Sequence, residues 1–246
     1  MGRGQNGRVE DAKEFLDLKL DHLFAIGGNR CVFEHPLDPA LCVKVNRKDR
    51  SPEFKWRKAV WWKRLRALDS FDENLEEERV LSTLQSRAPQ LSGRLFPSCH
   101  GQVRTPYGDG LVLTLFRDQD GGISSSLERA VLENTPGVDE AVDCFAKRWI
   151  DAAIPSRQLL LHNLVLRKGC KAQELCIVDG LGSGHLLDFG QFSEEMGRKR
   201  ASRLVTKLRE RILAIESRRN DWSPSMKDRL QPLSEEFRRR ALGLPS

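Results

Sequence analysis

The sequence lacks the features that identify membrane, secreted and zinc-binding proteins. No apolar stretch approaches the roughly 20 residues of a membrane-spanning helix, and the N-terminal residues MGRGQNGRVED have no apolar core of a signal peptide. The six cysteines form no C-x-x-C pair, and Cys31, Cys42 and Cys176 stand in apolar, strand-like runs, which is typical of buried thiols in a reducing compartment. We therefore expect a cytoplasmic protein with no membrane partner.

The sequence also has few residues of metal-ligand type that lie close together. Cys99 and His100 are adjacent, but no second pair of this kind accompanies them, whereas a structural zinc site usually takes four ligands. The 246 residues are 39% hydrophobic and 31% charged, which is typical of a globular protein with a well-solvated surface, and the length allows two lobes. The net charge of +6 tolerates acidic partners but identifies none.

The rest of the chain is organised around residues 26–45, which read IGGNRCVFEHPLDPALCVKV. Strands are predicted for 31–33 and 41–45, and two prolines favour a tight turn between them. Before the first strand, Gly27 and Gly28 have no Cβ atoms, so their backbone N–H groups can approach a polyanion. An ordinary turn is the alternative, because a full G-x-G-x-x-G is absent.

Lys44 stands between two valines in the second of these strands. A buried ammonium group without a partner costs several kcal/mol, so this position requires an anion nearby. A glycine turn, a strand, a tight turn and a strand that carries a lysine follow one another in the nucleotide site of protein kinases. This order indicates that Gly27, Gly28 and Lys44 contact a nucleotide.

A helix that can supply the partner of Lys44 is predicted for 73–85, which read ENLEEERVLSTLQ. Leu81 faces inward, and Glu77 lies one helical turn before Leu81 on the same face. We therefore expect Glu77 to pair with Lys44, with Glu78 as the next choice. A solvated row of glutamates is the alternative.

Two further strands are predicted for 96–103 and 111–116, and they complete a five-stranded small lobe. Residues 117–122, RDQDGG, are polar and end in glycine, which indicates a hinge. The base of a nucleotide is expected to hydrogen-bond to the backbone near Phe116 and Asp118. The segments predicted after the hinge are helices rather than strands. This order predicts a two-lobed α+β fold.

The expected division of the chain follows from these patterns. It comprises a flexible lead-in over 1–19, a small lobe over 20–118 with a basic, tryptophan-rich insertion over 46–69, a reduced helical large lobe over 119–220, and a polar tail over 221–246. Helices are predicted for 127–133, 138–154, 197–220 and 233–242, and the second of them turns Val142, Phe145, Ala146, Trp149 and Ala153 inward.

The loop expected to do chemistry departs from the usual kinase pattern. Kinase-like loops place an aspartate five positions before the asparagine that binds metal. If Asn163 is that asparagine, Gln158 occupies the aspartate position. Glutamine cannot accept a proton as a carboxylate does, although it can position a hydroxyl group or a water. His162 is also a candidate for the catalytic base. However, side chains alternate between the two faces where a strand begins, so His162 is expected to point away from the site and to pack in the protein or lie on its surface.

The second metal ligand is expected at the end of a buried strand. Asp179 follows the apolar run Cys176-Ile177-Val178, whereas the literal Asp-Phe-Gly begins later, at Asp188. Two short antiparallel strands and a turn fit the shorter separation from Asn163. We therefore expect Asn163 and Asp179 to hold Mg²⁺. The alternative is that Asn163 and Asp179 only form turns, since Asn and Asp are common at turns and strand ends.

The basic segment, residues 47–68, reads RKDRSPEFKWRKAVWWKRLRAL and carries nine basic and two acidic side chains. Phe54, Trp61, Leu65 and Leu68 recur at helical spacing, which predicts an amphipathic helix docked on the small lobe. The alternative is a surface for nucleic acid or an acidic protein. Interleaved Trp and Arg or Lys side chains can stack on bases and neutralise phosphates.

The stretch GGNRCVFEHPLDPALCVKV resembles the YrbL family of bacterial PhoP regulatory network proteins, which have a kinase-like fold. Looser matches are RDQDGG at 117–122, LLHNLVL at 160–166 and IVDGLG at 177–182, and the resemblance covers roughly Ala25 to Arg218. The family also departs from the usual aspartate at the position that Gln158 occupies here. The resemblance implies a two-lobed, protein-kinase-like fold.

The motifs and the resemblance together predict a regulatory protein that binds ATP and Mg²⁺. It is expected to be a pseudokinase, or an atypical phosphotransferase that lacks the usual aspartate. The alternative is a non-enzymatic binding module that uses the basic segment on nucleic acid or an acidic protein partner.

Overall fold

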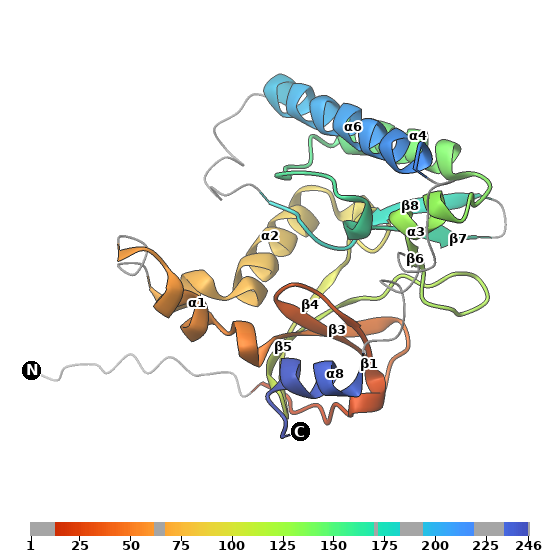
Figure 1. The fold of residues 1–246 in the computed structure, drawn as a ribbon. Coiled ribbons are helices and arrows are strands. Elements are labelled where there is room, and N and C mark those ends of the chain that lie inside the picture. Colours follow the sequence, from red (N-terminus) through yellow and green to blue (C-terminus); the bar gives the residue numbers. More distant parts are fainter. Residues whose placement is uncertain (1–12, 62–66, 170–171, 183–193, 219–233, 246) are drawn as a thin grey trace, which may run out of the picture.

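The computed structural model describes residues 13–61, 67–169, 172–182, 194–218 and 234–245 (Figure 1). Its first part is a five-stranded antiparallel sheet in the order β1-β2-β3-β5-β4. The strands are β1 (Leu23–Ile26), β2 (Arg30–Glu34), β3 (Leu41–Asn46), β4 (Cys99–Thr105) and β5 (Gly108–Thr114). This sheet confirms the predicted five-stranded small lobe.

The second part is mainly helical and contains a three-stranded sheet in the order β6-β7-β8. The strands are β6 (Ser125–Ser126), β7 (Leu164–Lys168) and β8 (Gln173–Ile177). The α-helices of the whole chain are α1 (Pro52–Lys58), α2 (Glu73–Arg87), α3 (Leu127–Leu132), α4 (Val138–Asp151), α6 (Glu194–Glu216) and α8 (Glu235–Leu242), and short 3-10 turns cover Leu20–His22, Lys48–Arg50, Leu68–Phe71, Pro89–Leu91 and Leu161–Asn163. Figure 1 shows α4 and α6 at one end of the molecule and α8 against the sheet at the other. The α+β prediction is confirmed.

The side chains of the first sheet divide between two hydrophobic cores, because successive residues of a strand point to opposite faces. Cys42 of β3 packs in the core that contains Val80 and Leu84 of α2. The next residue, Val43, lies in the core on the other face, which Leu242 of α8 helps to close. The sheet is therefore covered on both faces, by α2 and by the C-terminal helix.

The chain before β1 differs from the flexible lead-in expected for 1–19. In its described part, Phe15 forms a β-bridge with Arg104 of β4, and the Leu16 N–H donates to the Arg104 carbonyl oxygen at 2.8 Å. Leu16 and Leu18 are 5% and 2% exposed. Burying two leucines against the sheet offsets the conformational entropy lost when this segment is ordered.

The helix predicted across the basic segment is wrong over residues 59–61, and residues 62–66 lie outside the described part of the chain. Ser51 caps α1, because its hydroxyl accepts from the Phe54 N–H, and Pro52 occupies the first turn. Ala59 already has extended dihedral angles, and the next two residues, Val60 and Trp61, are β-branched and aromatic and therefore poorer helix formers. Trp61 is 71% exposed and is therefore not docked on the small lobe, whereas Phe54 is 36% exposed; Leu65 and the side chain of Leu68 lie outside the described residues.

The helical part follows its predicted pattern closely. Val142, Phe145 and Trp149 of α4 are buried, and so are Leu204 and Leu208 of α6. However, α4 ends at Asp151, three residues before the predicted end. Ala153 lies beyond the helix with φ = 48°, so its prediction as an inward-facing helical residue is wrong.

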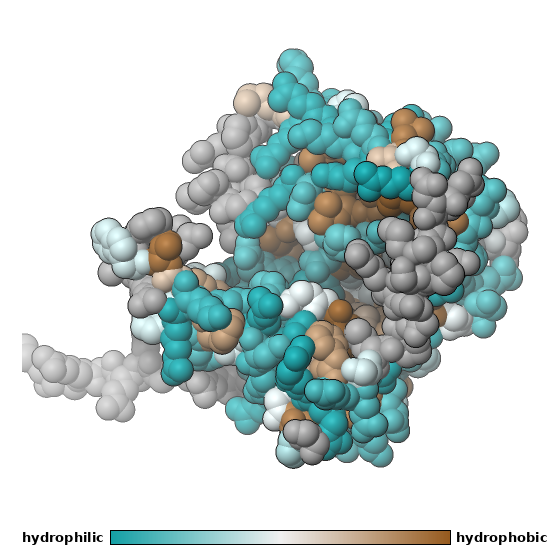
Figure 2. All heavy atoms as spheres, viewed as in Figure 1, coloured by the Kyte–Doolittle hydropathy of each residue, from teal (hydrophilic) through white to brown (hydrophobic). Residues whose placement is uncertain are grey.

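The surface in the view of Figure 2 is mostly hydrophilic, with apolar atoms gathered beneath α6 and on the part of the chain that carries α1. Among the described residues, the large apolar side chains that are exposed include Phe54, Trp56, Val60 and Trp61. No helix in the described ranges is both long and apolar enough to cross a membrane.

Candidate functional site

The cleft between the sheet and the helical part is organised by Lys44 of β3. Its Nζ lies 2.8 Å from Oε1 of Glu77 in α2 and 2.8 Å from the carbonyl oxygen of Val178. Lys44 is only 7% exposed, so the ammonium group is buried together with its anion. The structure brings Lys44 and Glu77 together as expected, whereas the next choice, Glu78, accepts a hydrogen bond from Gln102 instead.

Hydrogen bonds at the start of α2 explain why Glu77 faces Lys44. The Asp72 carboxylate caps the helix by accepting from the Asn74 N–H, and it also accepts from Nδ2 of Asn46 in β3. The Asn74 side chain donates to the Lys44 carbonyl oxygen at 3.0 Å. The first turn of α2 is thus bound to β3, which fixes the rotation of the helix about its axis.

Arg30 of β2 is a central residue of the cleft that the sequence reading missed. Its three side-chain nitrogens face three different carboxylates. Nη2 lies 2.8 Å from Oδ1 of Asp179, Nε lies 3.8 Å from Glu73, and Nη1 pairs with Glu77. Arg30 is 7% exposed. Although burial opposes the charged form, the attraction of Glu77, Asp179 and Glu73 raises the pKa of Arg30 above its ordinary value.

Strand register was the signal that could have identified Arg30. Val32 pairs with Lys44 across β2 and β3, and Arg30 lies two residues before Val32, on the same face of the sheet. An arginine that directly follows the glycine turn therefore points into the same cleft as the strand lysine.

Asp179 lies at the end of the chain that leaves β8, where the sequence predicted a carboxylate. Its Oδ1 accepts from the Gly180 N–H at 2.7 Å and from Arg30. Burial favours the neutral form of the Asp179 carboxyl, but the charges of Lys44 and Arg30 hold its pKa well below its usual range. The competing aspartate, Asp188, lies outside the described residues.

Asn163 and Gln158 reach the same cavity from the loop before β7. This cavity has a volume of about 260 Å³, and its lining includes Arg30, Glu77, Gln158, Asn163, Asp179 and Gly180. Gly180 has φ = 81°, and a Cβ atom there would lie 3.0 Å from Nδ2 of Asn163, so the close approach requires glycine. Buried Ser156 donates to the carbonyl oxygen of Gly180 at 2.7 Å and joins the two loops.

The residues expected to hold Mg²⁺ share this cavity but do not fit a metal ion as they are arranged. Oδ1 of Asp179 is already engaged by a guanidinium, and a second cation at the same carboxylate would be repelled by Arg30. Among the described residues, no group of three or more His, Cys, Asp and Glu side chains is arranged to bind a metal. The magnesium site at Asn163 and Asp179 therefore stays a prediction, and Arg30 competes with a metal ion for Asp179.

The glycine turn lies at the edge of the cleft. The Gly27 N–H donates to the Arg30 carbonyl oxygen at 2.8 Å, and the Gly27 carbonyl oxygen accepts from Arg47 at 3.0 Å. A Cβ atom on Gly28 would have no neighbour within 4 Å, so open space surrounds this residue. Neither glycine lines the cavity that holds Asp179, and contact of the turn with a nucleotide stays a prediction.

The hinge groups expected to bind the base are engaged within the protein. The Phe116 carbonyl oxygen accepts from the Ser124 N–H at 3.1 Å, and the Asp118 N–H donates to Gly122 at 2.8 Å. The Asp118 side chain accepts from the Ser124 hydroxyl and from the Lys168 N–H. A base that binds at Phe116 and Asp118 must therefore replace some of these hydrogen bonds.

The remaining candidate side chains lie away from the cavity. His162 is exposed and does not line it, in agreement with the surface role expected for this residue. Cys99 and His100 follow one another in β4, where the Cys99 N–H donates to Gln85 and the ring of His100 lies 3.5 Å from the Thr114 hydroxyl.

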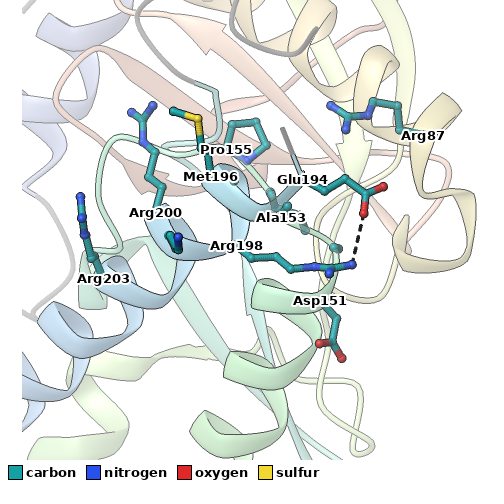
Figure 3. Close-up of a pocket in the computed structure, with 13 residues that line it drawn as sticks. Arg87, Asp151, Ala153, Pro155, Glu194, Met196, Arg198, Arg200 and Arg203 are labelled. Carbon is teal, nitrogen blue, oxygen red and sulfur yellow. Dashed lines mark hydrogen bonds and ion pairs between the residues drawn. The ribbon is translucent and has the colours of Figure 1, made fainter. Parts of the chain in front are cut away.

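A larger cavity of about 470 Å³ lies between the end of α2, the loop after α4 and the start of α6, and the sequence did not predict it. Figure 3 shows four arginines around it, of which Arg198 pairs with Glu194 at 3.3 Å. The four are Arg87, Arg198, Arg200 and Arg203. None of the predicted site residues lines this cavity.

A family model agrees with the resemblance seen in the sequence. A comparison with curated protein sequences found no match. Among solved structures, the chain is similar to a point mutant of the PknI kinase domain of Mycobacterium tuberculosis, with 14% identity and a TM-score of 0.41, over 75% of this chain and 70% of that one. The family model described as PhoP regulatory network protein YrbL matches residues 16–213, which is most of the chain. The protein belongs to the YrbL family of PhoP regulatory network proteins.

Proposed function

We propose that the protein binds a nucleoside triphosphate in the cleft between the sheet and the helical part and acts as a regulatory pseudokinase or atypical phosphotransferase. The observation that carries this proposal is the buried Lys44–Glu77 pair, which faces the same cleft as Asp179. A lysine held by a helix carboxylate is the arrangement that binds the phosphates of ATP in protein kinases. ATP is the expected ligand.

Two buried cations in the cleft, Lys44 and Arg30, could contact an anionic ligand. Glu77 shares its two oxygens between them, and Arg30 also pairs with Asp179 and Glu73, so a phosphate that binds Arg30 must replace some of these ion pairs. Arg157 also lines the cavity, at its more exposed side. Phosphate oxygens are strong acceptors for such cations.

The absence of a carboxylate at Gln158 limits the chemistry. Its side chain can orient a hydroxyl group or a water, but it cannot remove a proton. Any phosphoryl transfer then depends on positioning and on the charges of Lys44 and Arg30, and we expect it to be slow relative to ordinary kinases. Binding and regulation are accordingly the primary function in this proposal.

Thermal unfolding with ATP tests this proposal. A ligand present at about 100 times its Kd stabilises the folded state by roughly 2.7 kcal/mol, which raises the Tm of a chain of this length by about 5–10 °C. We expect this increase for the wild type and a much smaller one for Lys44→Met. Lys207→Met, which removes an exposed lysine of α6, should respond as the wild type does. Absence of any increase for the wild type, in magnesium or in EDTA, would disprove the proposal.

A second candidate function rests on the exposed aromatic residues of the basic segment. Trp56 and Trp61 are 37% and 71% exposed, next to the basic side chains of Arg57 and Lys58. Aromatic rings and cations interleaved in this way suit single-stranded nucleic acid better than a flat acidic protein surface, because bases can stack on the rings. Lys55 contributes less, since it pairs with Glu73 at 2.8 Å.

Salt dependence separates this candidate from nucleotide binding. If the basic segment binds single-stranded nucleic acid, affinity should fall steeply as salt increases, and the double variant Arg57→Gln with Lys58→Gln should show a smaller slope. Trp61→Ala should weaken binding by about 1–3 kcal/mol through lost stacking. Equal binding by all three proteins would exclude the segment as the contact surface.

A further inference from the structure

Arg30 lies among three carboxylates at the cavity that Asn163 and Asp179 share. The guanidinium reaches Asp179, Glu77 and Glu73 at once. It is attached to β2 next to the glycine turn and is 7% exposed, so its position is set by the fold rather than by solvent.

The charge balance of the cleft depends on this side chain. The cavity is lined by the carboxylates of Glu73, Glu76, Glu77 and Asp179, and Lys44 alone cannot neutralise them. Arg30 supplies the second positive charge, and a guanidinium stays charged at every physiological pH. A metal ion on the other oxygen of Asp179 would stand beside the guanidinium that holds Oδ1, and the two cations would repel each other.

We propose that Arg30 is the resident cation of this cleft and makes the binding of nucleotide phosphates independent of magnesium. The inference rests on the proposed function, because it concerns how the same site holds its ligand. Arg30 holds Asp179 and Glu77 in place, and its fixed positive charge attracts the phosphates that a metal ion would otherwise bridge.

Nucleotide affinity measured with the full chain in EDTA and in excess MgCl₂ tests this inference. For the wild type we expect Kd values for ATP that agree within about threefold in the two buffers. Arg30→Met should weaken binding in EDTA by about tenfold or more, and magnesium should restore part of that loss. Arg30→Lys, which keeps the charge, should retain most of the affinity in EDTA.

Two further variants keep the test decisive if Arg30→Met folds poorly. Asp179→Asn removes the carboxylate that a metal would need and releases Arg30, so binding in EDTA should become tighter, whereas a magnesium-dependent site would lose its binding. Arg104→Met removes an exposed arginine of β4 and should leave both Kd values unchanged.

The outcomes separate the two proposals. Wild-type binding that requires magnesium, with no added effect of Arg30→Met in EDTA, would overturn the role of Arg30 and leave nucleotide binding intact. No ATP binding by the wild type in either buffer would overturn the proposed function and this inference together.

Discussion

The guanidinium of Arg30 and the carboxylate of Asp179 lie 2.8 Å apart and join β2 to the loop that follows β8. Because Arg30 also pairs with Glu77 of α2, one side chain connects the sheet, the helix and the large lobe across the cleft. Lys44 repeats this connection through Glu77 and the Val178 carbonyl oxygen. Two buried cations therefore join the parts of the chain that line the cleft.

The low pKa of Asp179 predicts how stability changes with pH. The pKa is lowered in the folded protein, so the pairing contributes stability above the unfolded pKa, near 4, and the contribution is lost as pH falls through the folded value. Urea unfolding of the wild type and Asp179→Asn should therefore show the largest difference near neutral pH. That difference should shrink below about pH 4. A difference that grows toward acid pH would contradict the pairing.

Gly180 is predicted to be intolerant of substitution. A Cβ atom there would meet Asn163 at 3.0 Å, and φ = 81° is unfavourable for other residues. Gly180→Ala should lower the free energy of unfolding by roughly 1–3 kcal/mol and displace Asn163 from the cavity. Gly28→Ala, placed in open space without a positive φ, should change stability by about 0.5 kcal/mol or less. Equal effects of the two substitutions in chemical denaturation would contradict this account.

The C-terminal helix α8 is predicted to be an integral part of the small lobe. Leu242 is 3% exposed in the core that also contains Val43, and Arg47 lies over the ring of Phe237 at 5.0 Å. Leu242→Ala should cost about 2–4 kcal/mol of unfolding free energy, whereas Leu213→Ala, at a position that is 64% exposed on α6, should cost about 0.5 kcal/mol or less. Similar losses for both variants would show that α8 does not pack as described.

The cysteines are predicted to differ strongly in reactivity. Burial raises the pKa of the thiols of Cys31, Cys42 and Cys176 to about 12, whereas Cys144 in α4 is exposed. The thiolate is the reactive form, so iodoacetamide should modify Cys144 of the native protein at least about tenfold faster than these three. Peptide mass spectrometry measures the rates. Fast native modification of Cys31 or Cys42 would contradict their burial, and all four should react alike in denaturant.

Much of the small lobe could be predicted from the sequence because its signals are local. The valines on either side of Lys44 indicated a buried strand, and the helical period of 73–85 selected Glu77 as its partner. The separation between Asn163 and Asp179 fitted two short strands, and the structure brings both residues to one cavity. In each case the prediction depended on two or three residues that are close in the sequence, or on the length of one short connection.

The rest depended on contacts between distant segments. Arg30 was given no role from the sequence, because its role emerges only when the register of β2, the position of α2 and the loop after β8 are known together. The packing of Leu242 on the sheet also joins the two ends of the chain. A helix was predicted past Lys58 because the spacing of Phe54 and Trp61 matched a helical period, although Val60 and Trp61 are β-branched and aromatic and therefore poorer helix formers.

The most direct test of the account is calorimetric titration of ATP into the wild type and Lys44→Met, each in magnesium and in EDTA. The account predicts saturable binding by the wild type in both buffers and affinity lower by about tenfold or more for Lys44→Met. Wild-type protein that binds no ATP in either buffer, or Lys44→Met that binds as tightly as the wild type, would contradict the central claim that the Lys44–Glu77 cleft is a nucleotide site.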